Sequence, residues 1–377
     1  MSEQVFRNAR VVLADDVVVG SVLIRDGLLA EVASDSRAGE DLEGDYLIPG
    51  LIELHTDHLE THYRPRPGVF WDPASALHAH DVQVAGSGIT TVFDAVRIGS
   101  DRDMPQMREH AGHLVTAIGE ARQNGWLRAD HLIHLRCELP TADVVEQFDS
   151  FASHPATRLI SLMDHTPGQR QFTSMETYKL FYKKQLGGTQ AEADRYVAEA
   201  LAQHERYSSA NRRDLVARAQ ALRLPMASHD DATIAHIEEG VSDGVVISEF
   251  PTTLEAAAAA HDAGLAILMG APNVVRGRSH SGNISATDLV RSGLLDILSS
   301  DYVPFALLQA AFILPQRVEG LTLPQALATV TRNPAKAAGL DDRGEIAAGK
   351  RADLVRVKVV DDRPIVKGVW RQGHRVS

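Results

Sequence analysis

The pattern of apolar and polar positions divides the chain into two β-rich ends and a longer middle. Between residues 5 and 47, short runs of Val, Ile and Leu are separated by Asp-Asp, Asp-Gly and Glu-Gly, which is typical of antiparallel hairpins. The tail repeats this pattern. We therefore expect one small β domain built from residues 1–47 and 335–377, with a compact domain of residues 48–334 between them.

The middle alternates short apolar runs with amphipathic or alanine-rich segments. The runs that we interpret as strands are residues 48–58, 90–96, 131–138, 158–166, 225–231, 245–251, 266–272 and 297–303. Because these strands are apolar throughout, they indicate a parallel sheet covered by helices on its outer face. Eight strand-and-helix units close into a (β/α)₈ barrel. A doubly wound open sheet is the alternative, but no GxGxxG follows the first strand.

A long segment, residues 168–224, separates the fourth and fifth predicted strands and is helical, charged and aromatic in character. An insertion after a barrel strand lies on the face where active sites are built, which favours a lid. A decorative helical hairpin or an oligomer contact is an equally good interpretation.

Composition excludes several classes of protein. The 377 residues are 44% hydrophobic and 23% charged, which is globular rather than disordered, and the net charge of −12 argues against bulk nucleic-acid binding. A single cysteine, Cys137, forms neither an intramolecular disulfide nor a thiolate zinc site. With no signal peptide and no apolar run of about 20 residues, we expect a cytoplasmic protein.

The predicted strands are apolar until their last residues and then end in His, Asp or Glu. These polar strand ends are His55 and Asp57, Asp94, Glu138, Asp164 and His165, His229 to Asp231, Glu249 and Asp301. In a parallel barrel the carboxyl ends of all strands open on one rim, so these side chains should converge. Several carboxylates gathered there beside neutral imidazoles would repel one another and lose solvation, unless one or two divalent cations bound between them.

Individual positions suggest roles in such a site. His55 and Asp57 are two residues apart, so in a strand both point to one face and can bind one ion. Glu138 could bridge two ions with its two oxygens. We expect His165 and His229 to be ligands rather than structural histidines.

The remaining acids at the strand ends allow more than one role. Asp301 could accept the proton of a metal-activated water, or it could cap the helix that follows. The residues that either orient ligands or bind metal themselves are Asp164, Asp230, Asp231 and Glu249.

Cations follow the same strand ends. Arg64 and Arg66 lie just beyond the first strand and Arg170 lies in the insertion, while the loop after the seventh strand holds Arg276, Arg278 and His280 among Gly, Ser and Asn. Backbone N–H groups and guanidinium groups in such a loop could bind phosphate oxygens. So many cations in a net acidic chain predict an anionic, phosphorylated ligand.

The order of several long motifs carries a family resemblance. LIPGLIELHTDH near the start and TRNPAKAAGLDDRGEIAAGKRADLV near the end resemble the amidohydrolase superfamily. More narrowly, HTDHLETHYRPRP, SLMDHTPGQRQF, SHDDAT, EFPTTLEAA, LMGAPNVVRGRSHSGN and ILSSDYVP are similar to the PhnM family of the carbon–phosphorus lyase pathway. The resemblance covers essentially the whole chain.

The resemblance implies a metal-bearing barrel with a small β-sandwich made from both chain ends. It implies hydrolysis of α-D-ribose 1-methylphosphonate 5-triphosphate to the 5-phosphate and pyrophosphate, with one or two divalent ions (Zn, Mn, Mg or Fe) per chain. We also expect a homo-oligomer, with a dimer favoured, and no nucleic-acid or membrane partner. Carried onto this sequence, the implied metal-site residues are His55, Asp57, Glu138, His165 and His229, with Asp301 handling the water and His229 beside it.

The sequence departs from the broad superfamily in three places, which leave the number of metals open. The usual HxH is HxD here, Glu249 stands where many relatives have His, and Glu138 replaces a carbamylated lysine. Two other functions fit the same framework. One is hydrolysis of a C–N bond by a cyclic amidase or deaminase, and the other is a metal-free scaffold relative.

Overall fold

The computed structural model describes residues 3–34, 38–100, 105–170, 189–277 and 283–377. Its contacts divide the chain into two compact units. The first unit comprises Met1–Asp94, Glu120–Leu132 and Leu268–Ser377, and the second comprises Ala95–Gly119 and Ile133–Ile267. No helix of the described residues is long and apolar enough to cross a membrane.

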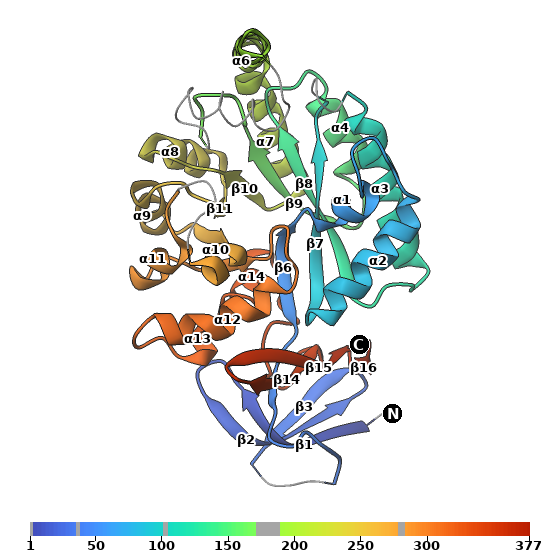
Figure 1. The fold of residues 1–377 in the computed structure, drawn as a ribbon. Helices are drawn as coiled ribbons and strands as arrows, with labels where there is room; N and C mark the ends of the chain where they lie inside the picture. Colours follow the sequence, from blue (N-terminus) through green and yellow to red (C-terminus); the bar gives the residue numbers. More distant parts are fainter. Residues whose placement is uncertain (1–2, 35–37, 101–104, 171–188, 278–282) are drawn as a thin grey trace. The chain divides into compact units, whose positions relative to one another are not determined.

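Both chain ends contribute to one sheet of the first unit, in the order β16-β15-β14-β5-β1-β2-β3, with β4 beside β1. Its strands are β1 (Glu3–Val12), β2 (Val17–Arg25), β3 (Leu28–Ala33), β4 (Glu40–Asp41), β5 (Tyr46–Pro49), β14 (Leu354–Val360), β15 (Arg363–Arg371) and β16 (His374–Arg375). Figure 1 shows the red C-terminal strands β14 and β15 together with the blue strands β1 to β3. The rings of Phe6 and Trp370 lie 4.7 Å apart in its core, so residues from opposite ends of the chain stabilise the sheet.

Two of the predicted parallel strands, β6 (Leu51–Thr56) and β13 (Ile297–Ser299), lie wholly in the first unit, and two more, β7 (Ile89–Ile98) and β12 (Ala266–Gly270), lie partly in it. β6 pairs with β7 and β12 with β13, both parallel, and a bridge joins Thr56 to Asp301. Every residue of β6 is buried, the polar residues Glu53, His55 and Thr56 included, so this strand shows no alternation of buried and exposed positions. At Gly50, just before β6, an added Cβ would lie 2.1 Å from the Thr90 hydroxyl, so only glycine fits.

Helices of the first unit follow these strands. They are α1 (His58–Tyr63), α2 (Pro73–Gly86), α10 (Ala271–Arg276), α11 (Ala286–Arg291), α12 (Ala306–Arg317), α13 (Leu323–Ala328) and α14 (Arg332–Ala337). α2 begins at a proline, and its cap Asp72 accepts a hydrogen bond from the Ser75 backbone N–H.

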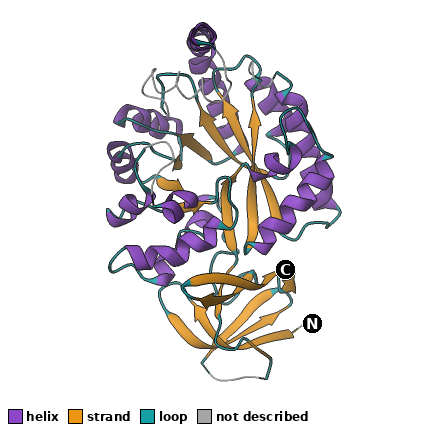
Figure 2. Ribbon diagram, viewed as in Figure 1, coloured by secondary structure: helices purple, strands orange, loops and turns teal. Residues whose placement is uncertain are grey.

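The second unit carries the other four parallel strands, paired in the order β8-β9-β10-β11. Their bounds are β8 (Asp130–Glu138), β9 (Thr157–Met163), β10 (Met226–His229) and β11 (Ile247–Glu249). The helices around them are α3 (Met107–Gln123), α4 (Val144–Phe151), α8 (Ile234–Asp243) and α9 (Leu254–Asp262). In Figure 2, purple helices flank the orange strands of this unit. The two units together therefore contain all eight predicted strands.

The predicted insertion is helical where it is described. It contains α6 (Gln190–Gln203), a π-helical turn (His204–Ser208) and α7 (Ser209–Leu222). A full capping box formed by Thr189 and Glu192 starts α6. Residues 171–188 of the insertion lie outside the described residues, so its role as a lid stays a prediction.

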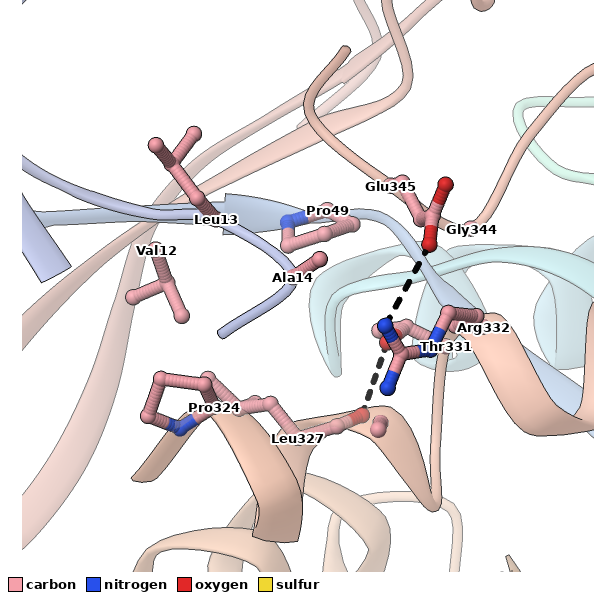
Figure 3. Close-up of a pocket in the computed structure, with 11 residues that line it drawn as sticks. Val12, Leu13, Ala14, Pro49, Pro324, Leu327, Thr331, Arg332, Gly344 and Glu345 are labelled. Atoms are coloured by element: carbon pink, nitrogen blue, oxygen red, sulfur yellow. Dashed lines mark hydrogen bonds and ion pairs between the residues drawn. The ribbon is translucent and has the colours of Figure 1, made fainter. Parts of the chain in front are cut away.

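A small hollow lies in the first unit next to the terminal sheet, with Pro49, Pro324 and Leu327 in its lining. Figure 3 shows Arg332 bridged to Glu345 at its edge, a contact of 3.6 Å. Pro49 precedes β6, so the hollow lies at the amino end of that strand, whereas His55 lies at the carboxyl end. We interpret it as a packing feature.

Candidate metal centre

Three predicted site residues meet at neighbouring strand ends of the second unit. Glu138 ends β8, His165 follows β9 and His229 ends β10. The His165 Nδ1 atom lies 2.7 Å from Glu138 Oε2, and the backbone N–H of His165 donates to Glu138 Oε1. The rings of His165 and His229 are 5.6 Å apart, and with Asp230 they offer ligand atoms within 4.8 Å of one another. These three predicted residues therefore lie close together in the structure.

Asp230 orients the His229 ring. Its carboxylate lies 2.9 Å from His229 Nδ1 and so fixes the orientation of the ring. Asp230 has a positive φ of 57°, and its backbone N–H donates to the Glu249 carbonyl at the end of β11. A backbone conformation this costly for a non-glycine residue is held in place by the neighbouring strand, and it turns the carboxylate back towards the imidazole.

Glu138 is ionised although it is buried. Burial raises the pKa of its carboxyl, but the charge and hydrogen bond of His165 and the Arg97 guanidinium at 3.9 Å outweigh burial and lower it to about 2. Both oxygens contact His165. The prediction that Glu138 bridges two ions therefore stays a prediction, while orientation of His165 is a contact seen in the structure.

Asp231 and Arg170 lie next to this cluster and support it through hydrogen bonds. The Asp231 carboxylate accepts hydrogen bonds from Ser228, Ser248 and the Arg170 guanidinium, and it is fully buried. Arg170 also donates to Glu239 over 3.1 Å and is only 6% exposed. With its guanidinium bound to two carboxylates, Arg170 positions β10, and its predicted contact with substrate is untested.

Two further predicted acids have protein partners. Glu249 is fully buried and accepts a hydrogen bond from the Ser161 hydroxyl. Asp164 lies 2.7 Å from His204 Nδ1 and accepts from Ser208, both in the π-helical turn of the insertion. These contacts do not involve a proposed metal ligand, so the role of both acids in the site stays a prediction.

In the first unit, the ends of β6 and β13 are tied together beside His55 and Asp301. The Thr56 hydroxyl donates to the Asp301 carbonyl over 2.7 Å, and the Ser299 hydroxyl donates to the His55 carbonyl. Asp301 has a φ of 55°, a second strained residue at a strand end. Helix α12 begins at Ala306 and its cap carries no side-chain hydrogen bond, so the alternative of Asp301 as a helix cap is wrong.

Glu53 is a site residue that the sequence pattern did not reveal. It is fully buried in β6 and accepts hydrogen bonds from the His55 N–H, the Ser299 hydroxyl and the Ser300 N–H. Burial raises the pKa of its carboxyl to about 7 despite these donors. Its place within an apolar run, LIELH, is the signal that could have identified it.

Asp94 differs from the prediction. Its carboxylate lies 2.9 Å from His80 Nε2 and 2.7 Å from His131 Nδ1, so its side chain belongs to a buried histidine cluster with α2. β7 continues to Ile98, so Asp94 lies inside the strand and not at its end, where the sequence pattern places it. The missed signal was HTDHLETH, in which His58 and His62 are four residues apart.

The predicted phosphate-binding cations are described only in part. Arg64, Arg66 and Arg276 are exposed in the first unit, and the Arg64 guanidinium lies over the Phe70 ring at 5.8 Å. Arg278 and His280 lie outside the described residues.

The donor set fits a divalent metal. It consists of buried or half-buried imidazoles and carboxylates with no cysteine, and the orienting contacts of His165 and His229 each use Nδ1. Nitrogen and oxygen ligands of this kind suit Zn²⁺, Mn²⁺ and Fe²⁺.

Comparison with known proteins gives consistent results. A sequence profile described as the amidohydrolase family matches residues 105–376. The chain is 47% identical over 376 residues to the alpha-D-ribose 1-methylphosphonate 5-triphosphate diphosphatase of Escherichia coli (strain K12), covering 99% of this chain and 100% of that protein. It is 25% identical to an imidazolonepropionase of Deinococcus deserti, covering 94% and 92% of the two chains.

Solved structures show the fold. A 5-methylcytosine deaminase from Klebsiella pneumoniae superposes with a TM-score of 0.67 at 14% identity, covering 99% of this chain and 98% of its own. A dihydropyrimidinase from Brevibacillus agri NCHU1002 gives 0.62 at 14% identity, with 99% and 95% covered. The predicted fold class, a parallel (β/α)₈ barrel with a separate sheet from both termini, is confirmed.

Proposed function

Because the chain belongs to the amidohydrolase family, we propose that it is a metal-dependent hydrolase that cleaves α-D-ribose 1-methylphosphonate 5-triphosphate into the 5-phosphate and pyrophosphate in phosphonate catabolism. The observation that carries this proposal is the 47% identity that runs end to end with a diphosphatase of that specificity. The proposal includes a cytoplasmic location and a homodimer.

The metal-binding part of the proposal assigns ligands by strand. His165 and His229 are the proposed ligands of the second unit, where Glu138 and Asp230 contact their Nδ1 atoms. His55, Asp57 and Asp301 are the proposed contributions of the first unit. A divalent ion bound there supplies a Lewis acid and a water of lowered pKa. The proposal is one or two such ions per chain, of Zn²⁺, Mn²⁺, Mg²⁺ or Fe²⁺.

The chain's own groups then handle a proton and the leaving group. The water oxygen forms a bond to the α-phosphorus, the bond from that phosphorus to the pyrophosphate oxygen breaks, and the Asp301 carboxylate accepts the proton. The tie between Thr56 and Asp301 holds this carboxylate's backbone against β6. Arg64, Arg66, Arg276 and the loop residues Arg278 and His280 neutralise charge that develops on the pyrophosphate.

Phosphorus NMR of the triphosphate substrate, incubated with enzyme and Mn²⁺ in ¹⁸O-water, tests the chemistry. The label is expected in the 5-phosphate product, because attack is at the α-phosphorus. Label in pyrophosphate would overturn this scheme. At saturating Mn²⁺ and matched metal content, Asp301→Asn should lower kcat by about 10² to 10⁴. Unchanged turnover would refute the role of Asp301.

Hydrolysis of a C–N bond is the second candidate, because an imidazolonepropionase aligns over most of the chain. A panel that compares the ribosyl triphosphate with hydantoins and imidazolones at equal concentration distinguishes the two. Phosphate-anhydride cleavage should exceed C–N cleavage by several orders of magnitude. Metal analysis of the same preparation excludes or supports a metal-free scaffold.

A further inference from the structure

A second group of histidines lies between α1 and α2 of the first unit, and none of its members belongs to the strand-end set proposed above. His58 and His62 are one helical turn apart on α1, and His80 faces them from α2. One ring nitrogen from each lies within 4.8 Å of the others. The Nδ1 atoms of His58 and His80 are 3.3 Å apart. Two nitrogen ligands of one tetrahedral zinc ion, each about 2.0–2.1 Å from the metal, lie roughly 3.4 Å apart.

A carboxylate fixes the tautomer of His80. His80 Nε2 lies 2.9 Å from Asp94 Oδ1, so this nitrogen carries the hydrogen and Nδ1 presents its lone pair to His58. The other oxygen of Asp94 bonds to His131 Nδ1 over 2.7 Å, and His131 Nε2 lies 3.3 Å from Asp81. This carboxylate-to-histidine arrangement is the one that metal-binding imidazoles use in proteins.

One ring nitrogen of His62 is unsatisfied in hydrogen bonding among the described residues. This atom, Nε2, is buried. A buried polar atom without a partner costs about 1–3 kcal/mol, so such an atom in a cluster of lone pairs needs an explanation.

We propose that His58, His62 and His80 bind one zinc ion, with Asp94 holding His80 from behind. The ion would join α1 to α2 and so fix the ends of residues 64–72, the segment that carries Arg64 and Arg66. Three imidazoles leave a fourth position for water. With no sulfur ligand and three nitrogen ligands, the site suits Zn²⁺ and not Mg²⁺. The three ligands of this site are not among the strand-end residues.

Zinc stoichiometry of the full-length protein tests the proposal. The wild type, His62→Gln and the control His78→Gln, an exposed histidine on the same helix α2, are stripped with chelator and titrated with Zn²⁺, and bound metal is measured by mass spectrometry. His62→Gln should bind one ion fewer per chain, or bind that ion at least about 100-fold more weakly. His78→Gln should match the wild type. Equal stoichiometry and affinity in His62→Gln would overturn the proposal.

A measurement on the unmodified protein covers the case in which His62→Gln does not fold. Crystals of the wild type soaked in Zn²⁺ should give an anomalous peak at the zinc edge among the three imidazoles. Absence of a peak there means that the three rings form a hydrogen-bonded network only, and the proposal fails. Both readouts count or locate metal, so they are independent of the phosphorus NMR that tests the proposed function.

Discussion

The strand-end cluster of the second unit and the helix-borne cluster of the first unit use the same side chains in different settings. At the strand ends, Glu138 and Asp230 each hold one imidazole, and the imidazoles come from successive strands. Between α1 and α2, one carboxylate, Asp94, holds two imidazoles. The first arrangement lies at the ends of barrel strands, whereas the second adjoins a buried ionic network of Asp94, His131 and Asp81.

The difference teaches how position in the fold decides the role of a histidine. Strand ends of a parallel barrel open on the face where substrates bind. The histidine cluster between α1 and α2 joins two helices, so an ion there is expected to stabilise the structure. The comparison therefore predicts that activity depends on the first cluster and stability on the second.

Metal removal should have the largest effect and should separate the two clusters. Exhaustive chelation is expected to lower hydrolysis of the triphosphate by at least about 10³-fold, because a bound cation contributes several kcal/mol of charge stabilisation. It should also lower Tm, since the ion between α1 and α2 binds only the folded state. Activity and Tm are followed while Zn²⁺ or Mn²⁺ is added back.

Zinc should restore both properties, whereas Mn²⁺ should restore activity more fully than Tm because three imidazoles bind it more weakly. In His62→Gln the loss of Tm on chelation should shrink while the loss of activity stays. If His62→Gln showed the same fall in Tm as the wild type, the division of labour between the clusters would be refuted.

His131→Gln should be the most destabilising single substitution considered in the helix-borne cluster. His131 is fully buried between the carboxylates of Asp94 and Asp81, with His80 alongside and Arg128 bound to Asp81. Burial lowers the pKa of the imidazole, but the two carboxylates outweigh burial and raise it to about 9. Removing one partner of such a buried charge group costs about 3–5 kcal/mol.

The same substitution predicts a pH dependence. Because the folded pKa of His131 is raised, its contribution is fully present below the unfolded value near 6.5 and is lost as the pH rises through about 9. The difference in free energy of unfolding between the wild type and His131→Gln should therefore shrink from pH 7 to pH 9.5. Denaturant unfolding measures it, with the exposed His261→Gln as control. A difference that grew with pH would contradict this account of the ion pair.

Much of the fold was predictable from the sequence because the rules that govern it are local or topological. The eight apolar runs correspond to β6 to β13, and turn residues marked the terminal hairpins. Glu138, His165 and His229 were predicted together because carboxyl ends of parallel strands share an edge. Applying that rule requires only the order of the strands along the chain.

The remaining site could not be read from the sequence because it depends on the packing of particular helices and on side-chain direction. Asp94 turns towards α2 rather than the rim, since His80 and His131 offer it buried donors. Glu53 was hidden because three donors from β6 and the β13 end compensate a carboxylate in an apolar strand. The spacing of residues in the sequence does not indicate where α2 packs. Nor does it indicate how close the end of β13 comes to β6.

Asp230→Asn should have an intermediate effect, on metal affinity rather than on chemistry. The carboxylate at 2.9 Å fixes the His229 ring and increases its basicity, and loss of such an orienting group costs about 10- to 100-fold in metal affinity. Activity should therefore fall at limiting Mn²⁺ and recover at saturating Mn²⁺. The exposed Asp262→Asn on α9 is the control. A deficit in kcat that persists at saturating metal would mean that Asp230 acts on the substrate directly.

Arg64→Ala should have the smallest effect, and it tests whether the helix-borne cluster influences substrate binding. Arg64 is exposed just after α1, beside the helix that the histidine cluster would anchor. Losing one charge-assisted contact to a phosphate oxygen costs about 1.5 kcal/mol, so KM for the triphosphate should rise about tenfold with kcat nearly unchanged. Arg25→Ala in the terminal sheet should leave KM unaltered. If the ion between α1 and α2 positions this segment, His62→Gln should raise KM in the otherwise wild-type protein but add little to KM in the Arg64→Ala background. Full additivity of the two changes in KM would show that the helix-borne cluster does not act through Arg64.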